Sequence, residues 1–164
     1  MKRFLVVFLI ITISFASVPV LAISEGQEGI IQKQCKAIKV NLRAVQREDA
    51  KVRIRLGAYY DTVLTKYIMP LNVKLVENNL SNAKFIDNQN EFADTKTVFV
   101  KDFTKYQQML EELVAVDCEA EPEKFYDELV DVRQRRKTME QDVLKMRRLI
   151  SEHIKLVEDL KGKL

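Results

Sequence analysis

The stretch that decides the fold is residues 122–164, PEKFYDELVDVRQRRKTMEQDVLKMRRLISEHIKLVEDLKGKL. Positions taken alternately four and three residues apart along this stretch are apolar, with two exceptions. The positions are Phe125, Leu129, Val132, Arg136, Met139, Val143, Met146, Ile150, His153, Val157, Leu160 and Leu164. An apolar period of about 3.5 residues held over several heptads is typical of a coiled-coil helix. We therefore predict one helix over 122–164, with Pro122 in the first turn, where proline is tolerated.

The same period predicts two more helices, over 31–78 and 92–117. The first seam is Ile31, Cys35, Ile38, Leu42, Val45, Asp49, Val52, Leu56, Tyr59 and Val63, and the second is Phe92, Phe99, Phe103, Tyr106, Leu110 and Leu113. Pro70 falls inside the first helix, where we expect a kink or break because proline cannot donate a helical hydrogen bond. Residues 78–91 are rich in Asn and are predicted to form a loop.

The sparse Gly and Pro content and the 31% charged fraction argue against a loop-rich or all-β protein. We predict an all-α fold: an elongated up-down-up three-helix antiparallel coiled-coil bundle after an N-terminal signal helix. Residues 31–164 form its single domain, and residues 23–30 form a flexible lead-in.

The first 22 residues have the three parts of a secretory signal peptide. Lys2 and Arg3 precede an apolar run, and Val20 and Ala22 are small residues at the −3 and −1 positions of a cleavage site. The alternative is an uncleaved membrane anchor over 4–23, which is just long enough to span a bilayer. The expected location is the periplasm or the extracellular space, with membrane contact only through an uncleaved segment.

Cys35 and Cys118 are the two cysteines of the chain. An exported protein meets an oxidising environment, and the up-down-up arrangement brings the start of the first helix to the turn before the third. We predict a Cys35–Cys118 disulfide. Two free buried thiols, or a bridge between two copies, are the alternatives.

One polar residue interrupts each of the two long seams. Asp49 lies 14 residues after Cys35, and Arg136 lies 14 after Pro122, so the disulfide would set both at the same height. We predict a buried Asp49–Arg136 pair that fixes the alignment of the helices, at some cost in stability. The alternative places both side chains in solvent at the edge of the seam.

Enzymatic and cofactor functions find little support in the residues. His153, the one histidine, lies on an apolar seam, which is typical of a core residue, and no nucleophile stands at a helical spacing from it. We expect no catalytic residues, cofactor or metal site. Without residues 1–22 the chain carries 25 basic and 24 acidic residues, a net charge of +1, so no nucleic-acid partner is expected. Asn79 begins a glycosylation sequon, which matters only in a host that glycosylates.

The signal peptide, Cys35 at the start of a long helix, and Asp117-Cys118 leading to Pro122-Glu123-Lys124-Phe125 together resemble a family of uncharacterised exported helical-bundle proteins of uncultivated bacteria. That resemblance implies a bacterial exported helical protein and brings no known activity. The expected function is non-enzymatic: binding a protein partner, or acting as a structural spacer in the cell envelope.

The alternative function is a chaperone-like or adhesin-type homo-oligomer that associates through leftover apolar surface at Leu144, Leu149 and Leu156. Periplasmic holdase chaperones of the Skp type offer an analogy, because they share the size, the signal peptide and long helical arms. They also have a small β-rich body and a strongly basic charge, which this sequence does not suggest.

Overall fold

The structure, a computed structural model, describes residues 23–80 and 83–162. The elements in order are α1 (Glu25–Thr62), a π-helical segment η1 (Val63–Ile68), α2 (Met69–Glu77), α3 (Ala83–Ala115) and α4 (Pro122–Lys161). These residues contain no strand, so the all-α prediction is confirmed, with three long helical stretches packed together. The predicted signal peptide, residues 1–22, lies outside the described residues.

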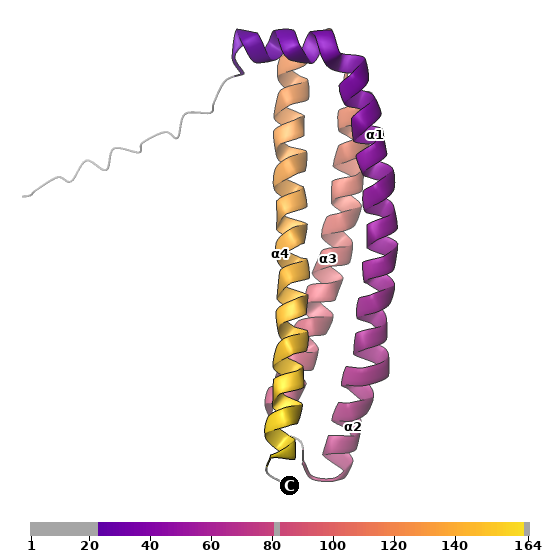
Figure 1. Cartoon of the computed structure of the whole chain (residues 1–164), viewed down its shortest axis with the longest axis vertical. Coiled ribbons are helices and arrows are strands. Elements are labelled where there is room, and N and C mark those ends of the chain that lie inside the picture. Colours follow the sequence, from indigo (N-terminus) through magenta and orange to yellow (C-terminus); the bar gives the residue numbers. More distant parts are fainter. Residues whose placement is uncertain (1–22, 81–82, 163–164) are drawn as a thin grey trace, which may run out of the picture.

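The chain runs along α1, η1 and α2 in one direction, returns along α3, and reverses again into α4 (Figure 1). The first turns of α1 lie across the end of the bundle at which α3 ends and α4 begins, and the helix then bends to run beside the other two (Figure 1). The packing is uneven: α3 and α4 contact each other along their length, whereas α1 contacts them less.

The core lies mainly between α3 and α4. All six predicted seam residues of α3 are buried, and Phe125, Val132, Met139, Met146 and His153 of α4 are buried at a strict spacing of seven. Each large apolar side chain removed from water stabilises the fold by about 1.5–3 kcal/mol. The period read from residues 122–164 is therefore the geometric basis of the bundle.

The predicted flexible lead-in, residues 23–30, is wrong from Glu25 onward, because α1 begins there. Ser24 is its N-cap: the Ser24 hydroxyl accepts a hydrogen bond from the Gln27 backbone N–H, and the Gln27 side chain accepts one from the Ser24 backbone N–H. This reciprocal pair satisfies two backbone N–H groups that would otherwise lack a hydrogen-bond acceptor at the start of a helix. The capping box thus offsets the low helix propensity of Gly26 and Gly29.

The predicted loop over 78–91 is also wrong, since α3 begins at Ala83 and not at residue 92. Phe85 and Asn88 are both buried and continue the four-and-three stepping back from Phe92. Burial of this first face of α3 outweighs the turn preference of its asparagines. The actual turn includes Asn79, whose φ of 56° is a left-handed conformation that asparagine tolerates better than most residues.

Of the kink or break predicted at Pro70, the break is absent, since η1 continues directly into α2. The six residues of η1 precede it, and the Met69 N–H donates to the Leu64 carbonyl, five residues back rather than four. Proline cannot donate to the Lys66 carbonyl and crowds it, and a wider helical turn accommodates the defect. The core register shifts near the same place: Tyr60 and Leu64 are buried, whereas the predicted seam residue Tyr59 is exposed.

Candidate binding surface and the clusters that hold it

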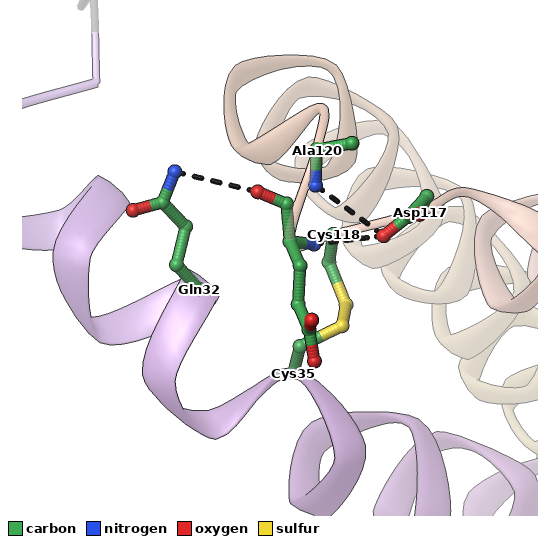
Figure 2. Close-up of a disulfide and its surroundings, with 6 residues drawn as sticks. Gln32, Cys35, Asp117, Cys118 and Ala120 are labelled. Atoms are coloured by element: carbon green, nitrogen blue, oxygen red, sulfur yellow. Dashed lines mark hydrogen bonds between the residues drawn. A yellow bond between two sulfur atoms is a disulfide. The ribbon is translucent and has the colours of Figure 1, made fainter.

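The two cysteines join α1 to the turn before α4. Their sulfur atoms are 1.93 Å apart and their Cα atoms 5.6 Å apart, and both side chains are buried. The sequence-predicted pair is therefore at disulfide-bonding distance. Nearby, Gln32 Nε2 donates to the Glu119 carbonyl, and Asp117 Oδ1 accepts from the backbone N–H groups of Glu119 and Ala120 (Figure 2). The bridge and the Gln32–Glu119 bond fasten the first turns of α1 to the turn before α4, and the Asp117 bonds stabilise that turn.

Asp49 and Arg136 meet across α1 and α4, as the 14-residue spacing predicts. Arg136 Nη2 lies 3.1 Å from Asp49 Oδ1. The pair is not buried as a whole: the Asp49 side chain is 15% exposed, but that of Arg136 is 59% exposed. The long guanidinium reaches water beyond a half-buried carboxylate, so the prediction of a buried pair is wrong for its basic member.

A third residue, which the sequence reasoning missed, completes this cluster. The Tyr106 hydroxyl on α3 donates to Asp49 Oδ2 at 2.6 Å. Burial, followed by this bond to a carboxylate, raises the pKa of Tyr106, so the phenol remains a donor throughout the physiological range. Asp49 therefore links all three long helices. The available signal was that Tyr106 shares the α3 seam with phenylalanines yet carries a hydroxyl that needs a partner when buried.

His153 is buried in a second polar cluster near the other end. The Asn88 amide nitrogen donates to the Leu149 carbonyl at 3.0 Å, so Asn88 Oδ1 must face His153 Nδ1, which is 3.1 Å away. An amide oxygen only accepts, and the neutral imidazole therefore carries its proton on Nδ1. Its Nε2 is buried with no hydrogen-bond partner among the described residues. Burial lowers the pKa of His153, and the ring is neutral at pH 7.

Among the described residues, the neighbours of His153 include the Asn88 amide and an aromatic ring. Its nearest ring neighbour is Phe85, 5.6 Å away between centroids and edge to face. Across the described part of the chain, no group of three or more His, Cys, Asp or Glu side chains is arranged to hold a metal ion. The role of His153 visible in the structure is packing and one hydrogen bond.

The outer side of α1 carries a basic face that the sequence reasoning missed. It consists of basic residues at successive steps of three or four: Lys33, Lys36, Lys39, Arg43, Arg47, Lys51 and Arg55. At those steps the side chains share one side of a helix. All except the half-exposed Lys39 are exposed. The signal was local: residues 33–55 hold eight basic and two acidic residues, a net charge of +6, which the overall +1 conceals.

Most members of this basic face have no carboxylate at ion-pairing distance among the described residues. Within residues 23–80 and 83–162, Lys51 is its one member with a carboxylate at ion-pairing distance, that of Glu48 at 2.7 Å. Lys51 in turn lowers the pKa of Glu48. Two aliphatic side chains on the same outer side, Val40 and Ile54, are 60% and 68% exposed. Exposed charge of one sign makes this side of α1 a candidate binding surface.

No family model, curated protein or solved structure matches this chain. No helix in the described residues has the length and apolar character needed to cross a membrane. The function must therefore be argued from the surfaces themselves.

Proposed function

We propose that this chain is an exported, non-enzymatic coiled-coil protein of the cell envelope, an up-down-up antiparallel bundle that binds an acidic protein partner through the basic face of α1. The unpaired charge of that face carries the proposal. A helix that served only as a spacer would gain from intramolecular salt bridges along its exposed side, yet six of the seven basic side chains have no carboxylate at ion-pairing distance within the described residues.

The way α1 is held supports this assignment. The disulfide at Cys35 and the buried Tyr60 fasten the helix near its two ends, and no residue of α1 between them is buried. The basic face thus extends along about 30 Å of the helix path, at 1.5 Å per residue. A rigid support reduces the ordering cost of binding, and complementary charge accelerates association and favours acidic partners.

The test is affinity capture from envelope extracts with residues 23–164 as bait, followed by binding measurements on the purified partner. Charge reversal of Arg43→Glu with Arg47→Glu should weaken binding at least about tenfold, and rising salt should weaken wild-type binding. The matched control is Lys101→Glu with Lys105→Glu, two exposed basic residues on α3 that change the net charge equally. Equal loss of binding in both variants, or no retained protein at all, would refute the proposed binding face.

Export has a separate test. Mass spectrometry of the protein recovered from the producing cells should give an N-terminus at Ile23, after cleavage behind Ala22. Recovery of the full 164 residues in the cytosolic fraction would contradict it.

A further inference from the structure

A groove lies at mid-height where α1 and α4 separate over α3. It has a volume of about 660 Å³, within the roughly 300–1,000 Å³ typical of small-molecule sites. Six apolar side chains from the three helices line it: Val52, Leu56, Phe99, Phe103, Met139 and Val143. Phe99, Phe103 and Met139 are buried, and Val52 is exposed at the edge.

The rim of the groove is mainly cationic. Arg53, Arg133, Arg136 and Lys137 line it, against the carboxylates of Asp49 and Glu140. Arg136 is paired with Asp49, and the Arg53 guanidinium lies 5.4 Å from the centre of the Phe103 ring. Arg133 and Lys137 are exposed, and no carboxylate of the described residues is at ion-pairing distance from either. One end of the groove thus offers two free cations beside an apolar floor.

The separation of the helices follows from where α1 is fastened. Cys35 and Tyr60 hold it on either side of the groove, and the α1 residues between them remain half-buried or exposed. Apolar side chains such as Val52 and Leu56 face the gap without being sealed from water. A ligand that covered this floor would bury apolar area that folding has left exposed.

We propose that this groove binds a single-chain anionic amphiphile, with the acyl chain on the apolar floor and the carboxylate or phosphate group between Arg133 and Lys137. The floor selects a hydrocarbon chain, and the rim selects a negative headgroup. The site is on the inner side of α1 and is independent of the binding face proposed above.

The experiment is calorimetric titration of residues 23–164 with dodecanoate and, separately, with a lysophosphatidylglycerol, each below its micelle concentration. One-to-one binding is expected, and the tighter ligand distinguishes a free fatty acid from a lipid headgroup. Arg133→Ser with Lys137→Ser should weaken binding at least about tenfold, since charge-assisted hydrogen bonds are lost. Val52→Trp should abolish it by filling the groove from its exposed edge.

The matched control is Lys101→Ser with Lys105→Ser, which removes the same charge from two exposed α3 residues outside the groove and should leave dodecanoate binding unchanged. Circular dichroism and thermal unfolding establish that each variant is folded. Equal affinity for dodecyltrimethylammonium, or undiminished binding by Val52→Trp, overturns the site. A dimer in light scattering that Val52→Trp converts to monomer, with no dodecanoate binding, overturns it in favour of a second copy of the chain.

Discussion

Two polar clusters lie between the helices, one partly exposed and one buried, and single atoms in them have measurable consequences. In one, the Asp49 carboxylate is held by Tyr106 and Arg136 from two different helices. In the other, His153 has a buried Nε2 without a partner among the described residues. A buried polar group lowers the stability of the fold when it has no hydrogen-bond partner, and it favours one arrangement of the helices when it has one. Each cluster therefore gives a distinct prediction.

The burial of His153 predicts a loss of stability in mild acid. Its pKa in the folded protein lies below the ordinary value of 6.5, so the unfolded chain binds the proton more readily. Stability is then fully present above about pH 6.5 and falls as the pH drops toward the folded-state pKa, by at most about 1.4 kcal/mol per pH unit. Urea unfolding at several pH values between 5.5 and 7.5 measures this slope. His153→Asn keeps an N–H donor at the position of Nδ1 without titrating, and a slope equal to wild type in that variant would contradict the assignment.

Removing the Tyr106 hydroxyl should destabilise the protein by about 1–2 kcal/mol, because the half-buried Asp49 carboxylate loses its shortest hydrogen bond. Tyr106→Phe preserves the ring and leaves no large cavity. Tyr67→Phe is the matched control, since Tyr67 is exposed, and it should change stability by less than about 0.5 kcal/mol. Denaturant unfolding of the three proteins gives the comparison, and equal effects of the two variants would rule out a special role for the Tyr106–Asp49 bond.

At the scale of elements, the success of sequence periodicity depended on how completely each helix is buried. It located α4 and the six α3 seam residues because those side chains face the core. Periodicity failed to locate the start of α3. Phe85, Phe92 and Phe99 follow the four-and-three pattern there, but the core positions between them hold the polar residues Asn88 and Thr95, so the apolar pattern is interrupted. Thr95 is accommodated by donating to the Glu91 carbonyl one turn back.

The candidate surfaces were harder to infer for a related reason. The Cys35–Cys118 pair followed from redox compartment and topology, and the Asp49–Arg136 contact followed from equal spacing. The basic face and the groove both lie where the other helices do not cover α1, and an apolar pattern in the sequence does not show which positions those are. Val52 and Leu56 fit the predicted seam, yet both line the groove and remain accessible to solvent.

The disulfide should matter most for the first turns of α1, which cross the end of the bundle. Closing a loop with a sequence separation of 83 stabilises by up to about 4–5 kcal/mol in the chain-entropy model. In Cys35→Ala with Cys118→Ala, thermal stability should fall and amide exchange should accelerate selectively over residues 25–38. Hydrogen exchange read by mass spectrometry checks this. Reduction of the wild type should reproduce the pattern, and unchanged protection of those residues would show that Gln32 and apolar contacts suffice.

At the scale of the whole molecule, the predicted apolar patch for self-association is mostly absent. Leu149 is buried and Leu156 half-buried, which leaves Leu144 as the exposed member of that set. The correction reflects the wider core stripe of α4, which includes Leu149 as well as the seam. Isolated exposed apolar residues are ordinary on soluble proteins, and a stable dimer needs about 800 Å² of surface from each copy.

We therefore predict an elongated monomer in solution for residues 23–164. The 40 residues of α4 span about 60 Å at 1.5 Å per residue, so the maximum dimension from small-angle scattering should be at least about 60 Å. The radius of gyration should exceed the roughly 14 Å expected for a globular domain of this length. Light scattering on the same sample supplies the mass, and a monomer with a compact radius would contradict the extended bundle. A concentration-independent dimer would favour the oligomeric alternative and place its interface on α1, the least covered of the three long helices.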